Sequence, residues 1–164
     1  MIFDILKFIF YIWIWIFFPT KFKGKRNIPK GKVIFVCNHT SNMDPILMYM
    51  STWRRQYFLA KKELFSNPLK RGIMKMAHAI PIDRGKTDLK AIKMSMKVLA
   101  ENKILTIFPE GTRNKTNEDL GEVKAGAGML AIKTKTPIVP VWIEKKPRIF
   151  RLNTIKFGKP FTLE

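Results

Sequence analysis

Residues 33–45 read Val-Ile-Phe-Val-Cys-Asn-His-Thr-Ser-Asn-Met-Asp-Pro, and their pattern is the most informative about the fold. Its first five residues are apolar and rich in β-branched side chains, which predicts a buried strand over Val33–Cys37. The polar residues that follow predict a loop. Asp44 and Pro45 predict the start of a helix, because Asp accepts an N–H of the first turn and Pro suits the first helical position.

The same alternation continues along the chain on both sides of this stretch. Strands are predicted at Val33–Cys37, Gln56–Ala60, Ala79–Ile82, Ile104–Phe108, Ile138–Ile143 and Thr154–Phe157, and helices at Pro45–Trp53, Pro68–Ala77, Thr87–Glu101 and Glu122–Thr134. The alternation predicts an α/β layered domain with a mixed, mainly parallel central sheet flanked by helices. The polar, turn-rich residues 113–121 predict a loop above a site.

Composition limits the class of protein. The chain has 164 residues, with 31 Lys plus Arg against 12 Asp plus Glu, and a formal net charge of +19. The length suits one domain, and a hydrophobic content of 46% is too high for a disordered basic tail. The lone Cys37 excludes an intramolecular disulfide framework and indicates a reducing, cytoplasm-facing setting. The charge predicts phosphate-bearing partners, but composition does not choose between these, general solubility and nonspecific nucleic-acid affinity.

The first eighteen residues form an apolar run with only two charges, and Pro19 closes it. We predict a membrane-anchoring helix over residues 1–20, followed by one domain over residues 21–164. The uninterrupted apolar part, residues 8–18, is shorter than the roughly 20 residues of a spanning helix, so a monotopic anchor is favoured and a single span is the alternative. Four cations that follow at once would meet anionic lipid on the cytoplasmic face: Lys21, Lys23, Lys25 and Arg26.

His39 and Asp44 are the first candidates for chemistry. Five residues apart, they would lie on different faces of a continuous helix, but across a turn they can meet. The carboxylate could then hold one imidazole nitrogen and leave the other as a general base. The alternatives are a plain helix cap for Asp44 and a satisfied loop histidine for His39. Cys37 and Ser41 invite covalent catalysis, but no Gly-x-Ser-x-Gly elbow is present.

Two further strands end in charged turns. Residues 82–84 read Ile-Asp-Arg, and residues 108–113 read Phe-Pro-Glu-Gly-Thr-Arg. An arginine guanidinium offers a planar fork that suits phosphate oxygens, so Arg84 and Arg113 predict a phosphate clamp at the strand ends. A surface arginine is the usual alternative for either one alone.

In order, these segments resemble the four blocks of the glycerolipid acyltransferases, most nearly the PlsC-type 1-acylglycerol-3-phosphate (lysophosphatidate) acyltransferase family. The first three blocks are His39-x4-Asp44 and the two turns above, and the fourth is the Ile-Val-Pro-Val of residues 138–141. The resemblance covers residues 28–162, and its first and third blocks rarely match together by chance. It implies the α/β fold that the alternation predicts.

The resemblance also implies a role for each matching residue. His39 would be the general base, and Asp44 would orient it and balance its charge. Pro140 would shape the acyl-donor side, although a buried edge strand explains it equally well. The glycerol phosphate of the acceptor would be bound by residues of the middle blocks, with three weaker candidates beside them: Arg84, Glu110, Gly111, Thr112 and Arg113, then Lys61, Lys124 and Gly126.

The implied reaction transfers an acyl group from acyl carrier protein or coenzyme A to the sn-2 hydroxyl of lysophosphatidate. The product would be phosphatidate, in phospholipid biosynthesis at the membrane, and neither a metal nor another cofactor is expected. One alternative keeps the fold and changes the acceptor to glycerol 3-phosphate or another lysophospholipid. The other is a non-enzymatic basic module that coats anionic lipid or nucleic acid.

Overall fold

The computed structural model describes residues 2–83, 87–109 and 120–164, with side chains from residue 8 in the first helix and from residue 126 in the last. The strands are β1 (Thr20–Lys23), β2 (Val33–Cys37), β3 (Gln56–Lys61), β4 (Ala79–Ile82), β5 (Ile104–Ile107), β6 (Ile138–Ile143) and β7 (Asn153–Phe157). The α-helices are α1 (Ile2–Phe17), α2 (Asp44–Met50), α3 (Pro68–Met76), α4 (Leu89–Ala100) and α5 (Leu120–Thr134). Short 3-10 turns lie at Lys25–Asn27 and Lys62–Phe65.

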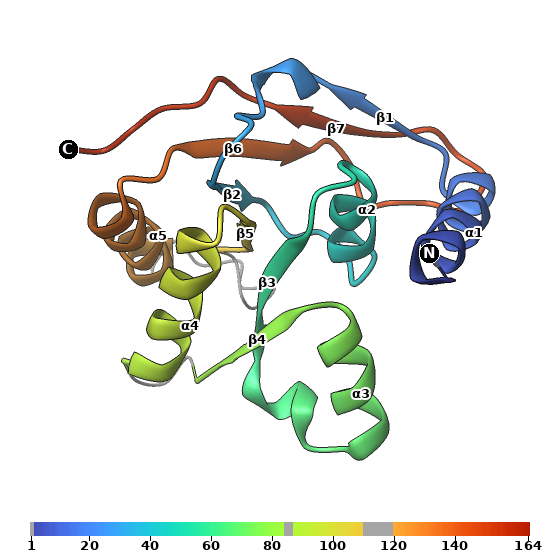
Figure 1. The fold of residues 1–164 in the computed structure, drawn as a ribbon. Helices are drawn as coiled ribbons and strands as arrows, with labels where there is room; N and C mark the ends of the chain where they lie inside the picture. The colour runs from blue at the N-terminus through green and yellow to red at the C-terminus, as the bar shows by residue number, and fades with distance from the viewer. Residues whose placement is uncertain (1, 84–86, 110–119) are drawn as a thin grey trace.

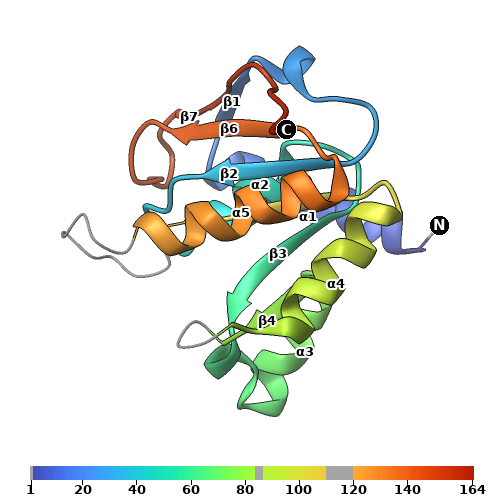
Figure 2. The same cartoon turned by 90° about the vertical axis from the view of Figure 1, so that its left-hand side faces the viewer.

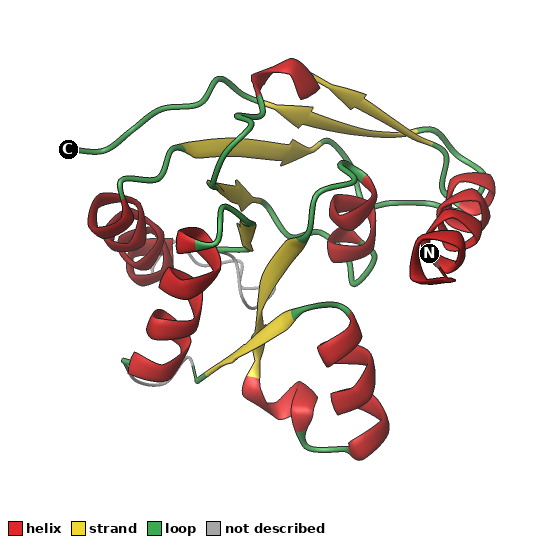
Figure 3. Ribbon diagram, in the orientation of Figure 1, coloured by secondary structure: helices red, strands yellow, loops and turns green. Residues whose placement is uncertain are grey.

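The strands of the described chain form one sheet in the order β1-β7-β6-β2-β5-β3-β4. Strands β6, β2, β5, β3 and β4 run parallel, whereas β7 is antiparallel to β6 and β1 is parallel to β7. The predicted mixed, mainly parallel sheet flanked by helices is therefore confirmed (Figure 1). Parallel strands need crossovers, and the helices between them cover both faces of the sheet (Figure 3).

Two hydrophobic cores lie on opposite faces of the sheet, and β2 is therefore buried on both sides. Val33, Phe35 and Cys37 contribute to the core beneath α1 and α2. Ile34 points to the other face, where apolar residues of α4 and α5 pack (Figure 2). An unbroken apolar run is what a strand between two helical layers requires.

The first helix, α1, is apolar and lies at one end of the sheet (Figure 1). Tyr11, Ile14 and Phe18 pack against the core of the α2 face. Most of its remaining described apolar side chains are exposed: Phe8, Ile9, Phe10, Ile12, Trp13, Trp15 and Ile16. Within residues 2–83, 87–109 and 120–164, no helix combines the length and apolarity that crossing a membrane requires.

The structure departs from the predicted elements at one strand and two helix ends. Strand β1 was not predicted, because Thr-Lys-Phe-Lys is short and half charged. It forms by pairing with β7, with Thr20 opposite Asn153 and Lys23 opposite Lys156. Helix α2 ends at Met50, three residues before the predicted end, and α5 begins at Leu120, so the last two residues of the predicted loop 113–121 are helical.

Candidate active site

The site lies at the carboxyl edge of the parallel strands. Strand β2 runs between β5 and β6, with Val36 opposite both Ile107 and Pro140. The loop that follows β2 therefore emerges between the ends of two neighbouring strands. Crevices at this edge of open α/β sheets are where ligands bind.

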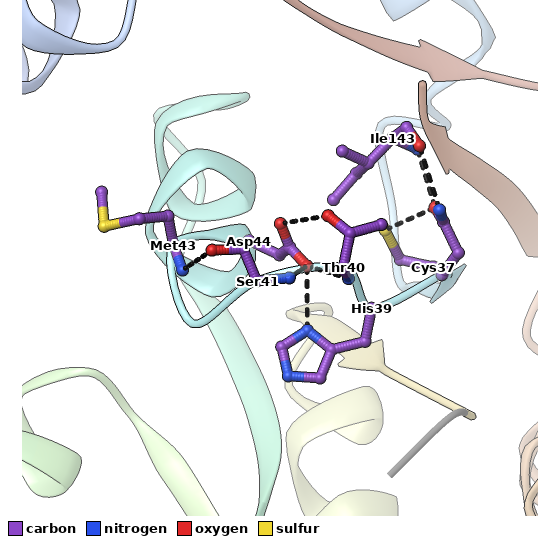
Figure 4. Close-up of polar contacts among 8 residues, drawn as sticks. Cys37, His39, Thr40, Ser41, Met43, Asp44 and Ile143 are labelled. Carbon is purple, nitrogen blue, oxygen red and sulfur yellow. Dashed lines mark hydrogen bonds and ion pairs between the residues drawn. The ribbon is translucent and has the colours of Figure 1, made fainter. Parts of the chain in front are cut away.

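Asp44 is fully buried at the first position of α2 and turns its carboxylate back toward the preceding loop (Figure 4). Its Oδ2 accepts hydrogen bonds from the backbone N–H groups of Thr40 (2.5 Å) and Ser41 (2.7 Å). The hydroxyl of Thr40 donates to Oδ1 at 3.2 Å. The helix-cap alternative is wrong, because Met43 occupies the cap position and the carboxylate oxygens bond backward instead.

His39 makes a fourth hydrogen bond to the carboxylate of Asp44. Its Nδ1 lies 2.9 Å from Oδ2 of Asp44 (Figure 4). Four donors thus surround the carboxylate, and their hydrogen bonds offset the cost of burying its charge. With the Nδ1 proton directed at Asp44, the lone pair of neutral imidazole lies on Nε2.

The imidazole of His39 is held from the side as well. Its ring packs against Phe108, just after β5, with centroids 4.8 Å apart and planes tilted by 39°. The His39 side chain is 29% exposed, and among the described residues no hydrogen bond to Nε2 is found. An oriented imidazole with one accessible nitrogen can take a proton from a bound hydroxyl.

Asn38 positions this loop, and sequence reasoning assigned it no role. Its Nδ2 donates to the carbonyl of Ile143 at 3.0 Å, and its Oδ1 accepts from the N–H of Ile143 at 2.7 Å. The side chain thus pairs with the end of β6 as another strand would. A polar residue directly after a buried strand was the available signal, but its partner lies 105 residues away.

The two side chains that invited covalent catalysis have other contacts. Cys37 is fully buried in the core at the end of β2. The hydroxyl of Ser41 accepts the N–H of Met43 at 3.3 Å, and its own N–H is used by Asp44. Cys37 is thus held in the core and Ser41 in the loop.

The remaining candidates are only partly covered by the described residues. Lys61 ends β3 and lies opposite Ile82 of β4, so it shares the carboxyl edge with His39. Gly126 lies in α5 with open space where a Cβ would be. Pro140 is exposed in the middle of β6, close to Gly158. Five candidates and the side chain of Lys124 lie outside the described residues: Arg84, Glu110, Gly111, Thr112 and Arg113.

The roles of these residues toward phosphate or acyl donor stay predictions. In the part of the chain that the structure describes, no group of three or more His, Cys, Asp or Glu residues is arranged to hold a metal ion. The chemistry that the geometry supports is proton transfer by His39.

Comparison with known proteins supports the resemblance. Residues 19–144 match the family model described as Acyltransferase. A Bacillus subtilis protein named 1-acyl-sn-glycerol-3-phosphate acyltransferase is 37% identical over 122 residues, 73% of this chain and 60% of that protein. One of the same name from Streptococcus pneumoniae is 37% identical over 110 residues, 66% of this chain and 40% of that protein.

The fold has a solved counterpart. The crystal structure of the 1-acyl-sn-glycerophosphate acyltransferase PlsC from Thermotoga maritima superposes with a TM-score of 0.64 at 24% identity, covering 93% of this chain and 64% of the other. The chain spans about half the length of the curated relatives it matches. Because the family model covers most of the chain and includes both His39 and Asp44, the chain belongs to the acyltransferase family.

Proposed function

We propose that the chain is a 1-acyl-sn-glycerol-3-phosphate acyltransferase. It would transfer a fatty acyl group from an acyl thioester to the sn-2 hydroxyl of lysophosphatidate and form phosphatidate. The contact between Nδ1 of His39 and Oδ2 of the buried Asp44 carries the proposal, because it leaves Nε2 as a base at the edge of the sheet. The names of the relatives supply the substrate class.

The reaction needs no covalent enzyme intermediate. Nε2 of His39 takes the proton of the acceptor hydroxyl while the hydroxyl oxygen attacks the thioester carbonyl carbon. The carbonyl π electrons move to oxygen and form a tetrahedral oxyanion. When this collapses, the C–S bond breaks and the leaving thiolate takes the proton back from His39. Asp44 stabilises the transient imidazolium and keeps Nδ1–H in place.

The acceptor phosphate would be bound by cations at the same edge of the sheet. Lys61 ends β3, and in the sequence Arg84 and Arg113 come after β4 and β5, the two neighbours of β3 in the sheet. Arginine forks suit phosphate oxygens, whereas lysine acts as a point charge. The other acceptor-site residues are Glu110, Gly111, Thr112, Lys124 and Gly126, and Pro140 belongs to the donor side. The donor is an acyl carrier protein or coenzyme A thioester.

Helix α1 would hold the enzyme at the cytoplasmic face of the membrane as a monotopic anchor. Trp13 and Trp15 are 58% and 54% exposed, which is costly in water and favourable at the headgroup level. The acyltransferase domain would then comprise residues 21–164. Lys21 and Lys23 of β1 follow the helix directly, where anionic headgroups would attract them.

A substitution of the base tests the activity. His39→Ala should lower turnover of labelled lysophosphatidate with an acyl thioester by about 10²–10⁴-fold, the usual contribution of a positioned general base. His78→Asn is the matched control, because it removes the only other histidine, at a position of φ 55° that asparagine tolerates. Near wild-type turnover by His39→Ala would refute the assignment.

The choice of acceptor needs a second assay. Lysophosphatidate, glycerol 3-phosphate, a second lysophospholipid and a phosphate-free monoacylglycerol are compared at equal concentration. Lysophosphatidate should be acylated fastest and the phosphate-free acceptor slowest, because the arginine clamp binds phosphate. Preference for glycerol 3-phosphate would keep the fold and chemistry and change the substrate. Preference for a phosphate-free acceptor would remove Arg84 and Arg113 from the site. Salt-sensitive lipid binding without any transfer would favour the non-enzymatic basic module.

A further inference from the structure

The loop between β6 and β7 exposes an unusual set of side chains. Ile149, Phe150 and Leu152 are 56%, 69% and 68% exposed. Four exposed cations and no carboxylate accompany them within residues 145–152: Lys145, Lys146, Arg148 and Arg151. We name residues 145–152 the basic-apolar loop.

A buried asparagine fixes the shape of the basic-apolar loop. Oδ1 of Asn153 accepts the N–H of Arg148 at 3.0 Å, and Nδ2 donates to the carbonyl of Arg151 at 2.9 Å. The same Nδ2 also lies within bonding distance of the carbonyls of Arg148 (3.4 Å) and Pro19 (3.3 Å). Asn153 is only 8% exposed. The apolar side chains are therefore exposed on a turn that hydrogen bonds hold in shape.

Phe150 has an unusual backbone conformation. Its φ is +55°, in the left-handed region that a bulky residue rarely adopts. Such strain persists where the surroundings enforce it and is concentrated at functional positions. Here the strained backbone points an aromatic ring outward, with 69% of the residue in water.

The loop continues the exposed surface of α1. The N–H of Phe150 donates to the carbonyl of Phe17 at 2.7 Å, and the two rings lie 5.4 Å apart. The N–H of Asn153 donates to the carbonyl of Pro19 at 2.8 Å. Figure 1 shows the chain between β6 and β7 reaching the end of α1 that leads into β1. The apolar side chains of the loop thus extend those of the helix.

We propose that the basic-apolar loop is a second membrane-inserting segment, which binds an anionic leaflet beside α1. Ile149, Phe150 and Leu152 enter the boundary between headgroups and acyl chains, and the cations contact lipid phosphates. One weak anchor binds a membrane reversibly, and a second signal of apolar plus basic residues makes attachment stable. The proposal rests on the monotopic attachment through α1 proposed above.

Charge selects lipid as the occupant of this surface. A second copy of the chain would bring another +19 against the four cations of the loop. Nucleic acid would match the charge but would leave Phe150 and its apolar neighbours in water. An anionic bilayer meets both requirements at once, since it offers phosphate at the surface and hydrocarbon beneath it.

The test is binding of the full-length chain to vesicles, with and without anionic lipid. Phosphatidylcholine vesicles are compared with phosphatidylcholine–phosphatidylglycerol vesicles, for wild type, Phe150→Asn, Leu152→Ser and the double variant Arg148→Gln/Arg151→Gln. Matched controls come from α4, on the opposite face of the sheet. They are Leu89→Ser, since Leu89 is 66% exposed, and Lys90→Gln/Lys93→Gln.

Each variant has a distinct expected result. Phe150→Asn and Leu152→Ser should each weaken partitioning about tenfold on both kinds of vesicle, as loss of an inserted apolar side chain does. The double arginine variant should bind anionic vesicles about 30-fold more weakly than wild type and neutral vesicles equally well. Phe150→Asn should melt no lower than wild type, because asparagine tolerates a positive φ. The α4 controls should bind like wild type.

Other outcomes would overturn the proposal in recognisable ways. Suppose that Phe150→Asn and Leu152→Ser bind vesicles like wild type and that Trp13→Ser of α1 loses binding. The role of α1 as an anchor would then stand, and the membrane role of the basic-apolar loop would be refuted. A change of sedimentation in the loop variants without a change in vesicle binding would make the loop a contact between copies. If wild type itself ignores vesicles, both membrane proposals fail, and turnover of a water-soluble short-chain acceptor then tests the acyltransferase activity separately.

Discussion

His39 and Asp44 differ in burial, and this difference gives them different roles. Asp44 is fully buried and saturated by donors from its own loop, so it fixes the loop as well as the imidazole. His39 is partly exposed, and its ring packs against Phe108. Substitution of His39 should therefore change the chemistry more than the stability, whereas substitution of Asp44 should change both.

Asn38 allows a sharp prediction at the same scale. Asn38→Ala would leave the N–H and C=O of Ile143 without their partner, although Ile143 is 1% exposed. Unsatisfied buried groups cost about 1–3 kcal/mol each, so the free energy of unfolding should fall by about 2 kcal/mol or more. Turnover should fall too, because the loop that carries His39 loses its attachment to β6.

Urea unfolding and turnover measure the two effects of Asn38→Ala. Asn42→Ala is the control, since Asn42 lies exposed in the same loop. Equal stability of the Asn38 and Asn42 variants would show that the pairing with Ile143 contributes nothing.

At the scale of single elements, a carboxylate holds the start of α4 to the end of β4. Asp88 caps α4 by accepting the N–H groups of Lys90 and Ala91, and it also accepts the N–H of Asp83 at 3.0 Å. These backbone hydrogen bonds, from Ala91 and Asp83 first, lower the pKa of the Asp88 carboxyl below its ordinary value of 3.8. The strand end that precedes Arg84 is thereby tied to the next helix.

The sign of the pKa shift predicts a pH dependence. A carboxyl whose pKa is lower in the folded state stabilises the fold above its ordinary value, and this stabilisation is lost as pH falls through the lowered value. Asp88→Asn keeps a helix cap but loses the charge and the second oxygen acceptor. It should melt below wild type at pH 7, and the difference should close below pH 3.8. Melting curves across pH measure this, and a constant difference would contradict it.

The elements also differ in how far local sequence explains them. Strands β2, β4 and β6 have the predicted bounds, because apolar runs between polar turns are a local signal. Helix α2 ends early, since Ser51 and Gln56 bond to the carbonyl of Met48 and close the helix there. Strand β1 exists only because β7 offers it an edge.

At the scale of the whole molecule, the N-terminal and C-terminal parts of the chain come close together at Gly24 and Phe157. This glycine has φ +74°, and a Cβ there would lie 2.3 Å from the carbonyl oxygen of Phe157. The side chain of Asn27 donates to the same oxygen at 3.0 Å. The close approach holds β1 against β7 and so attaches α1 to the sheet.

Replacement of Gly24 by alanine should loosen that attachment. Gly24→Ala adds an unfavourable φ to a backbone clash, so the free energy of unfolding should fall by about 1–3 kcal/mol. Gly72→Ala is the matched control, because nothing lies within 4 Å of its Cβ position in α3. That change should raise stability by up to about 1 kcal/mol, the helix preference of alanine over glycine. Denaturant unfolding measures both changes in the free energy of unfolding. Changes of the same sign in the two variants would contradict this prediction.

The alternation of strands and helices, the apolar first segment and the spacing of His39 and Asp44 are local patterns, so they can be read from the sequence alone. The contacts of each group follow from the folded chain. The conformation of the loop after β2 decides that the N–H groups of Thr40 and Ser41 bond to Asp44. The pairing of Asn38 with Ile143 and the exposure of Phe150 beside α1 depend on the sheet order. Residue spacing restricts near neighbours, whereas contacts across more than a hundred residues follow from how strands pair and helices cover them.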